Sequence, residues 1–132
     1  MTDARSDSVT FASLGLIDEV MAGIKQAGFV ECTPIQAQTL PLALAGRDVA
    51  GQAQTGTGKT AAFLVALYQA LLTRAPAPSR TKTSVRALIV APTRELAVQI
   101  HRDALVLGAH TGLKHTVVFG GIDYDKIGRA HV

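Results

Sequence analysis

The stretch "AQTGTGKT" at residues 53–60 decides the fold class that we expect for this chain. It comes at the end of "DVAGQA", which is expected to be a short buried strand, and leads directly into the helix-forming run "TAAFLVALYQALLT" at residues 60–73. The two glycines allow several backbone N–H groups to face one anion, and the N-terminus of the following helix adds positive potential. A strand, a glycine-rich turn and a helix in this order are typical of a phosphate-binding loop. The alternative is a glycine-rich turn that contains a lysine by chance.

The loop supplies the groups that a nucleotide phosphate and its metal ion need. Lys59 provides a compact positive charge for the β- and γ-phosphates, and the hydroxyl of Thr60 is a hard oxygen ligand for Mg²⁺. We therefore expect Lys59 and Thr60 to be the catalytic residues and Thr60 to be the Mg²⁺ ligand. The residues expected to bind the nucleotide are those of the whole loop: Ala53, Gln54, Thr55, Gly56, Thr57, Gly58, Lys59 and Thr60.

Helical patterns precede the loop. Residues 15–29, "GLIDEVMAGIKQAGF", carry apolar side chains at helical spacing. The next helix, "TPIQAQTLPLALAG", is expected to start with Thr33 as its cap and Gln36 in a capping box. Pro41 is expected to end or kink this second helix, because proline removes a backbone hydrogen bond.

Apolar runs that separate the helices predict the strands of a sheet. "VRALIVA" at residues 85–91 is almost continuously apolar, as expected for a strand that is buried on both faces. "HTVVFGG" at residues 115–121 is a third strand, and residues 93–112 between them form a helix capped by Thr93. Together with "DVAGQA", this alternation predicts an α/β fold with a parallel sheet.

Composition excludes some classes of protein. The chain has 132 residues, of which 48% are hydrophobic, and this suits one compact domain. Its one cysteine, Cys32, cannot form an internal disulfide, and its apolar runs are too short to span a bilayer. Residues 1–10 are polar, lack the apolar core of a signal peptide and are expected to be flexible. We expect a cytoplasmic protein with no membrane partner, and the net charge of +3 is compatible with a polyanionic partner.

Residues 28–36, "GFVECTPIQ", resemble the Q motif of the DEAD-box RNA helicases, and Phe11 lies upstream where that family has an isolated aromatic residue. The resemblance implies that Gln36 recognises the adenine edge and that Phe11 stacks on the base. A side-chain amide carries the donor and the acceptor that adenine requires. The alternatives are that Gln36 serves only the capping box and that Phe11 is a hydrophobic lid on the first helix.

Two further motifs resemble the RNA-contacting motifs of the same family. "PTRELA" at residues 92–97 is similar to motif Ia, and "GG" at 120–121 is similar to the next motif along the chain. The resemblance implies that RNA is a partner, whose backbone is contacted by Pro92, Thr93, Arg94, Gly120 and Gly121. The alternative is that Thr93 is only a helix cap and that Arg94 and Glu95 form a solvated pair.

The resemblance covers residues 11–126 and is closest to a bacterial branch that is associated with the RNA degradosome. It implies an ATP-dependent RNA helicase with a RecA-like topology, of which this chain is the N-terminal part of the first helicase domain. It also implies ATP and Mg²⁺ as cofactors and degradosome proteins as partners of the full-length protein. The sequence has no "DEAD" motif and no second domain, so we expect the fragment itself to be inactive.

Other functions fit part of this evidence. One is a small phosphate-loop NTPase or kinase, in which Arg94 has a substrate role. Another is a non-catalytic module that binds RNA or a protein partner. A preference for adenine nucleotides distinguishes a protein with a Q motif from the first of these.

The last six residues, "IGRAHV" at 127–132, do not follow the family pattern. They place Gly128 where the family has a helix, at a cost of about 1 kcal/mol relative to alanine. The codons ATC GGA AGA GCA CAC GTC spell these six residues, and that string looks like the start of a widely used short-read sequencing adapter. Our hypothesis is that this tail is translated adapter, and the alternative is a genuine short C-terminus.

Overall fold

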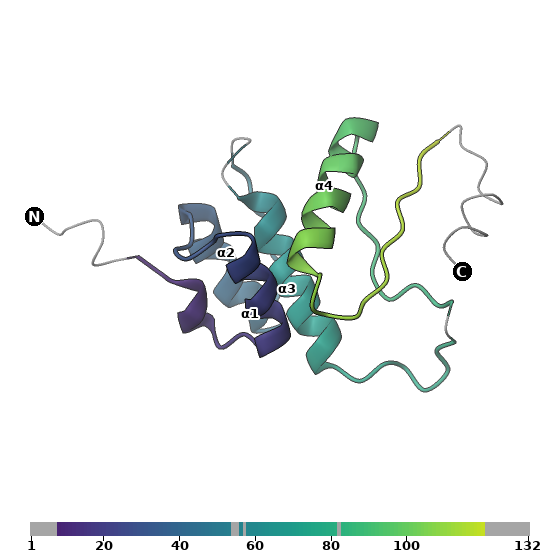
Figure 1. The fold of residues 1–132 in the computed structure, drawn as a ribbon, viewed down its shortest axis with the longest axis horizontal. Helices are drawn as coiled ribbons and strands as arrows, with labels where there is room; N and C mark the ends of the chain where they lie inside the picture. Colours follow the sequence, from purple (N-terminus) through teal and green to yellow (C-terminus); the bar gives the residue numbers. More distant parts are fainter. Residues whose placement is uncertain (1–7, 54–55, 57, 82, 121–132) are drawn as a thin grey trace, which may run out of the picture.

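The computed structural model describes residues 8–53, 56, 58–81 and 83–120. These residues form a short 3-10 helix and four α-helices (Figure 1). The elements are η2 (Phe11–Leu14), α1 (Asp18–Gln26), α2 (Pro34–Leu44), α3 (Lys59–Thr73) and α4 (Arg94–Leu107). The expectations for residues 1–7, for the tail at 127–132 and for Gln54, Thr55, Thr57 and Gly121 lie outside the described residues.

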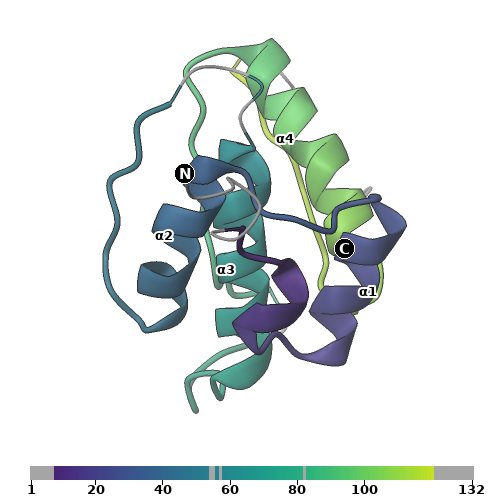
Figure 2. The same cartoon turned by 90° about the vertical axis from the view of Figure 1, so that its left-hand side faces the viewer.

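Helix α3 lies at the centre of the bundle, with α2 on one side and α1 and α4 on the other (Figure 2). Its central position explains why its sequence is apolar on more than one face. The buried core consists mostly of aliphatic side chains from all four helices, and Phe11 of η2 closes one end of it. The largest fully buried side chains are Tyr68, Phe11, Ile24, Leu40, Leu64, Val20 and Val65.

Helix α2 begins as predicted but ends later than predicted. The Thr33 hydroxyl accepts a hydrogen bond from the Gln36 N–H, and the Gln36 side chain accepts one from the Thr33 N–H, so the capping box is present. The prediction that Pro41 ends the helix was wrong, because α2 continues through Pro41 to Leu44. The kink, which was the other outcome expected at Pro41, stays a prediction. Packing of α2 against α3, with Leu40 fully buried between them, offsets the single backbone bond that proline removes.

Helices α1 and α4 approach each other closely at Gly23. A Cβ atom at this position would overlap the carbonyl oxygen of Leu107 and lie 2.7 Å from its carbonyl carbon. Glycine is therefore required at the crossing.

Helix α4 itself ends at Leu107 with Gly108 as its C-cap, five residues earlier than the end at Gly112 that the sequence predicted. At Gly108 a Cβ would lie 2.9 Å from the Tyr68 hydroxyl, so this residue also allows close packing.

The predicted sheet does not form among the described residues, and this expectation was not met. The three segments 48–53, 85–91 and 115–120 do not form strands, and among the described residues the one β-bridge is an isolated antiparallel bridge between Thr10 and Glu31. A strand needs a neighbour that satisfies its backbone N–H and C=O groups. The segment expected to be buried on both faces is instead open to solvent, since Leu88 and Val90 are each 81% exposed.

Side chains nevertheless anchor these unpaired segments to the helices. The Arg86 guanidinium donates hydrogen bonds to the carbonyl oxygens of Leu71 at 3.0 Å and Arg74 at 3.4 Å, at the C-terminal end of α3. A cation is favourable there because the helix dipole is negative at its C-terminus. Residues 113–120 run back alongside α4 from its C-terminal end toward its first turn, as both ribbon views show (Figures 1 and 2).

Two kinds of feature are absent from the described part of the chain. No helix there has the length and apolar character needed to cross a membrane. Within the same residues, no group of three or more His, Cys, Asp or Glu side chains is placed to hold a metal ion.

Candidate nucleotide-binding site

The N-terminus of α3 is the centre of the candidate site. Gly58 is its N-cap with a φ of +90°, and Gly56 just before it has a φ of +82°, so both adopt the left-handed conformation that favours glycine. No side chain caps this helix, and its first turn contains no acidic residue. In contrast, α2 and α4 are capped by Thr33 and Thr93. The N–H groups at the start of α3 are therefore available for an anion.

Lys59 lies folded over the loop. Its Nζ atom donates a hydrogen bond to the Ala53 carbonyl oxygen at 2.5 Å, which joins the two ends of the loop. An ammonium group has three donors, so two remain for phosphate oxygens. Thr60, the next residue, is half-buried in the first turn of α3. The predicted catalytic pair thus lies at the helix N-terminus, where the sequence placed it.

The Gln36 side chain connects α2 to the loop. It is 3% exposed and is the one amide or charged side chain among the buried residues of the described chain. Its Oε1 accepts a hydrogen bond from the Thr33 N–H at 2.8 Å, and its Nε2 donates one to the Gly58 carbonyl oxygen at 3.1 Å. The same Gly58 carbonyl oxygen accepts from the Ala62 N–H at 3.0 Å, the first backbone bond of α3. Since the C=O and N–H of a trans peptide point in opposite directions, the Lys59 N–H points out of the helix terminus, and Gln36 supports this orientation.

Both expected roles of Gln36 are compatible with this geometry. The capping-box role is confirmed by its bonds to Thr33. Its Oε1 retains a second lone pair and its Nε2 a second proton, which are the groups that an adenine edge requires. Adenine recognition therefore stays a prediction. Sequence analysis missed the bond to Gly58, because the two residues are 22 positions apart and no local pattern joins them.

Phe11 is buried rather than presented to solvent. It is 1% exposed, its ring stacks on Phe29 with 6.1 Å between centroids, and its N–H donates to the Val30 carbonyl oxygen. These contacts fix η2 to the segment that carries the Q-like motif. They agree with the alternative that Phe11 is a hydrophobic lid, and stacking on a base would require the ring to become exposed.

The residues present fit a nucleotide phosphate. At Gly58 a Cβ atom would overlap the Nε2 of Gln36 and lie 3.2 Å from the Thr33 hydroxyl, so only glycine fits between the loop and α2. The helix terminus is free of side-chain caps and Lys59 is adjacent to it. The N–H groups of this terminus and the Lys59 ammonium together present donors that a phosphate group could accept.

A second group of predicted site residues meets at the N-terminus of α4. Thr93 caps the helix by accepting a hydrogen bond from the Leu96 N–H at 3.1 Å, so its predicted capping role is confirmed. The Arg94 guanidinium donates to the Gly120 carbonyl oxygen at 3.2 Å and lies over the Phe119 ring. The structure thus brings the motif at 92–97 next to Gly120. The contacts of Arg94 differ from the solvated pair with Glu95 that the alternative predicted.

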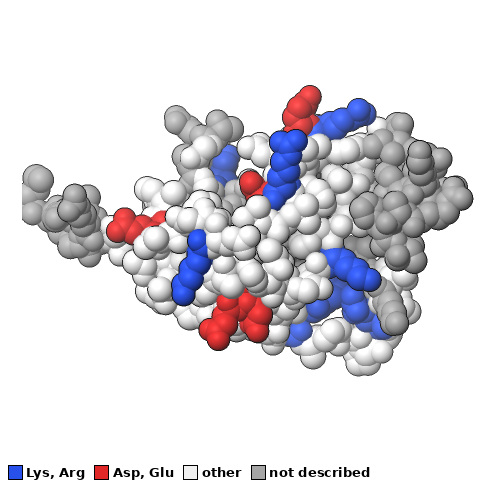
Figure 3. All heavy atoms as spheres, in the orientation of Figure 1, with Lys and Arg blue, Asp and Glu red and all other residues white. Residues whose placement is uncertain are grey.

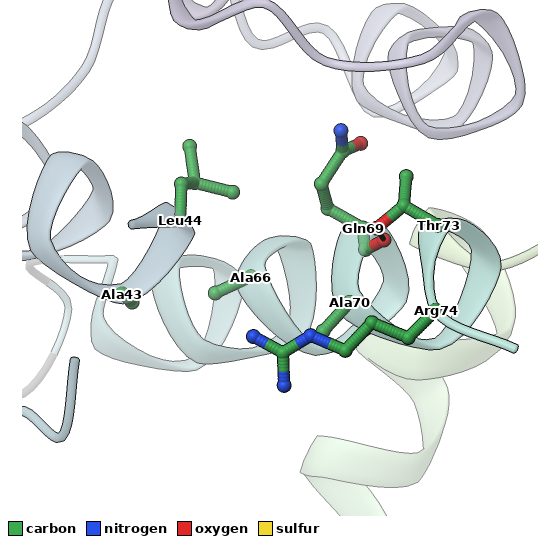
Figure 4. A pocket seen from close by; sticks show the side chains of 7 residues that line it. All are labelled: Ala43, Leu44, Ala66, Gln69, Ala70, Thr73 and Arg74. Atoms are coloured by element: carbon green, nitrogen blue, oxygen red, sulfur yellow. Dashed lines mark hydrogen bonds between the residues drawn. The ribbon is translucent and has the colours of Figure 1, made fainter. Parts of the chain in front are cut away.

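Neither the charges on the face in Figure 3 nor the hollow between α2 and α3 locates this site. On the face in Figure 3, Lys and Arg side chains lie in several separate places, with acidic side chains between them and much uncharged surface. The hollow in Figure 4 has a volume of about 60 Å³ and lies between α2 and α3. Ligand pockets for small molecules measure roughly 300–1,000 Å³, so this hollow is too small for a nucleotide. It is lined by Ala43, Leu44, Ala66, Gln69, Ala70, Thr73 and Arg74.

Comparison with known proteins identifies the family. The family model described as "DEAD/DEAH box helicase" matches residues 33–131, which include the capping box, the loop and α4. This chain belongs to the DEAD/DEAH box helicase family. The last four residues of the Q-like motif, the phosphate loop and the motif at 92–97 are thus parts of a helicase sequence, as their resemblance implied.

Individual relatives agree with this assignment. The chain is 58% identical over 126 residues to the ATP-dependent RNA helicase RhlB of Xanthomonas oryzae pv. oryzae, covering 96% of the chain and 22% of that protein. It superposes on the crystal structure of a DEAD box protein from Methanococcus jannaschii with a TM-score of 0.78 and 31% identity, over 94% of the chain and 32% of that structure. It also superposes on the RNA helicase Prp28 of Chaetomium thermophilum bound to ADP, with a TM-score of 0.77 and 34% identity. That match covers 92% of the chain and 29% of the Prp28 structure. The helicase chain described here therefore spans about a fifth of the length of its curated relative.

Proposed function

We propose that this chain carries the adenine-nucleotide site and part of the RNA-contacting surface of an ATP-dependent RNA helicase of the RhlB type. The observation that carries the proposal is the junction at Gly58. There, a helix N-terminus without a side-chain cap, the Lys59 ammonium and the buried Gln36 amide converge on one turn of backbone. An ATP molecule offers a group to each of them: phosphate oxygens to the first two and the adenine edge to the third.

Each residue has a separate task in this proposal. Lys59 exchanges its bond to the Ala53 carbonyl for phosphate oxygens, and the Lys59 N–H, which points out of the N-terminus of α3, donates to the same phosphate chain. The Thr60 hydroxyl binds Mg²⁺, since it is a hard oxygen ligand. Bound ATP supplies the phosphoanhydride bond whose hydrolysis drives the helicase cycle. Gln36 links adenine recognition to the shape of the loop, because one side chain touches both.

The RNA backbone is proposed to lie at the N-terminus of α4. Thr93 keeps its own hydroxyl proton for a phosphate oxygen while its oxygen caps the helix. Gly120, where no Cβ would meet any described atom within 4 Å, allows a phosphate to approach the backbone closely. Contacts of this kind position RNA without reading its sequence, so binding is expected to be independent of sequence and to weaken with added salt.

The wider setting is also a proposal. In a protein of the relatives' length, we propose that residues 48–53, 85–91 and 115–119 are strands of a parallel RecA-like sheet. Val85, Leu88 and Val90, which are now 79–81% exposed, would then be covered. By likeness to RhlB, proteins of an RNA degradosome are proposed as partners of the full-length protein, and the cytoplasm as its location.

Two substitutions test the nucleotide site. Lys59→Ala should weaken ATP and GTP binding alike, because it removes a charge that faces phosphate. Gln36→Ala should weaken ATP binding about five- to a hundredfold more than GTP binding, since a base-specific hydrogen-bond pair is worth roughly 1–3 kcal/mol. Lys25→Ala on α1 removes an equal charge away from the loop and is the control. Unchanged affinity for both nucleotides in Lys59→Ala, measured with fluorescent nucleotide analogues, would contradict the proposal.

A further inference from the structure

The stretch from residue 49 to residue 94 has basic residues but no acidic ones, although the chain has 10 aspartates and glutamates in all. Its basic residues are Lys59, Arg74, Arg80, Lys82, Arg86 and Arg94. The first belongs to the phosphate loop and the last to the motif at 92–97. The basic residues at 74–86 belong to neither the nucleotide site nor the RNA surface proposed at α4.

Arginines from three segments of the chain meet at the C-terminal end of α3. Arg74 is the C-cap residue of this helix, and the Arg86 guanidinium donates to its carbonyl oxygen at 3.4 Å and to that of Leu71 at 3.0 Å. The Arg74 Nη2 atom lies 3.4 Å from the position that a Cβ of Gly46 would occupy, so it reaches the turn after α2, where Arg47 follows. The largest group of basic side chains in Figure 3 lies over this end of α3 and the chain after it, with no acidic side chain inside the group.

These positive charges are not neutralised by the part of the chain that the structure describes. Arg47, Arg74 and Arg80 are exposed, and none of the three forms an ion pair with a described carboxylate, not even Arg47 with its neighbour Asp48. Arg86 faces only the partial negative charge of the end of α3. Uncompensated guanidinium groups on one surface attract a polyanion, because binding releases the counterions of the polyanion.

The residues around these arginines suit phosphate groups better than a lipid surface. Residues 75–84 have only alanine and proline as apolar residues, whereas segments that lie in a membrane interface place Trp, Phe or Leu between their basic residues. Thr81 and Thr83 add exposed hydroxyl groups close to Arg80 in the sequence, and hydroxyls are common donors to phosphate oxygens. Residues 74–86 contain no aromatic side chain on which a base could stack, so any contact with RNA there is with the backbone.

The Arg74 side chain also lines the hollow between α2 and α3. It extends from the end of α3 back past Ala70 toward Ala66 (Figure 4). The volume of about 60 Å³ has room for a few water molecules. Oxygen atoms of one phosphate group can take their place, next to a guanidinium whose planar donors match phosphate.

We propose that Arg47, Arg74 and Arg80 form a second contact surface for the phosphates of single-stranded RNA, at the end of α3 that is farthest from the phosphate loop. The inference rests on the proposed function, because it takes RNA as the polyanion. Helix α3 has 15 residues, so its two ends lie about 22 Å apart. The N-terminus of α4 lies at the same end of the bundle as the N-terminus of α3 (Figures 1 and 2). The arginine surface therefore contacts a part of the RNA that the surface at α4 does not reach.

The test measures binding of a fluorescein-labelled oligouridine by anisotropy at several salt concentrations. Arg74→Gln with Arg80→Gln removes two charges and keeps Arg86, which anchors the backbone. This double variant should bind about two- to thirtyfold more weakly. The slope of log affinity against log salt should become smaller by about 1.4, since each contact with a single strand contributes about 0.7. Arg74→Lys with Arg80→Lys keeps the charges and should keep the slope. Lys25→Gln with Arg102→Gln, which removes two exposed charges from α1 and α4, is the matched control and should change neither value.

Two results would overturn the inference. One is an affinity and a salt slope in Arg74→Gln, Arg80→Gln that equal those of the control, and RNA binding then belongs to the surface at α4 alone. The other is unchanged binding of oligouridine together with a loss of binding to phosphatidylglycerol vesicles, which assigns these arginines to a membrane. The surface at α4 is tested separately by Thr93→Asp, which keeps a helix cap but repels phosphate. Unchanged affinity in Thr93→Asp contradicts the contact proposed at α4 and leaves the arginine surface as the place where RNA binds.

Discussion

Replacing Gly58 by alanine perturbs the contact between the Gln36 side chain and the phosphate loop. The φ of Gly58 is +90°, and the left-handed conformation costs an L-residue about 1–2 kcal/mol. The new Cβ would also overlap the Nε2 of Gln36 and lie 3.0 Å from its Cδ, so the Gln36 side chain has to move. It then loses its bonds to the Gly58 carbonyl and to the Thr33 N–H, which cost about 1 kcal/mol each.

Gly56→Ala is the matched comparison for this substitution. Gly56 has a similar φ of +82°, but a Cβ there would meet no described atom within 4 Å. Alanine at position 56 therefore introduces the backbone strain but does not displace the Gln36 side chain. Because phosphate binding requires the native loop conformation, the full free-energy cost of each substitution should appear as a higher dissociation constant for ATP. We expect ATP to bind about 5- to 30-fold more weakly in Gly56→Ala. In Gly58→Ala we expect a further loss of about 30-fold, measured by titration with a fluorescent ATP analogue.

A double-mutant cycle isolates the contact itself. In a Gln36→Ala background, the side chain that Gly58→Ala displaces is already absent, so the second change costs only the backbone strain. The four dissociation constants should give a coupling energy of about 1–2 kcal/mol between positions 36 and 58. Equal losses in Gly56→Ala and Gly58→Ala, together with no coupling in the cycle, would refute the reasoning.

Three further predictions concern the rest of the molecule. Gly23→Ala should lower the free energy of unfolding, measured in urea, by about 1–3 kcal/mol, because the new Cβ forces α1 away from Leu107. A higher free energy of unfolding would show instead that the greater helix propensity of alanine prevails. Acidification below about pH 6.5 should lower the free energy of unfolding, since the unfolded chain takes up a proton at His115 where the folded chain, whose His115 pKa is lowered, does not. In the His115→Gln variant, acidification should lower the free energy of unfolding by less than in the unmutated chain. An equal decrease in both proteins would show that His115 is not the cause. The double variant Leu88→Lys, Val90→Lys should reduce concentration-dependent self-association in light scattering, and unchanged association would show that these exposed side chains do not drive it.

Local signals in the sequence predicted local structure well. The Thr33 cap with Gln36, the Thr93 cap and the start of α3 at the loop were all predicted, because each depends on residues within one or two turns of helix. The family was predicted for a related reason. Its motifs are short strings of residues that can be recognised before their arrangement in space is known.

Features that depend on distant residues could not be predicted in the same way. The bond from Gln36 to Gly58 spans 22 positions and that from Arg94 to Gly120 spans 26. The apolar run at 85–91 has the composition of a buried strand, but a strand forms only where a neighbour pairs with it, and composition does not show whether one does. The effect of Pro41 was overestimated because the packing of α2 on α3, which holds the helix together, is a tertiary property.

The central claim is that this helicase-family chain has a site for an adenine nucleotide at the N-terminus of α3, next to Gln36. The most direct test is a competition titration of the unmutated chain, in which ATP and GTP displace the same fluorescent nucleotide analogue. The account predicts that ATP binds about five- to a hundredfold more tightly than GTP, the value of one base-specific hydrogen-bond pair. Equal affinity for ATP and GTP would contradict it, since a site that holds only phosphate cannot distinguish the two bases.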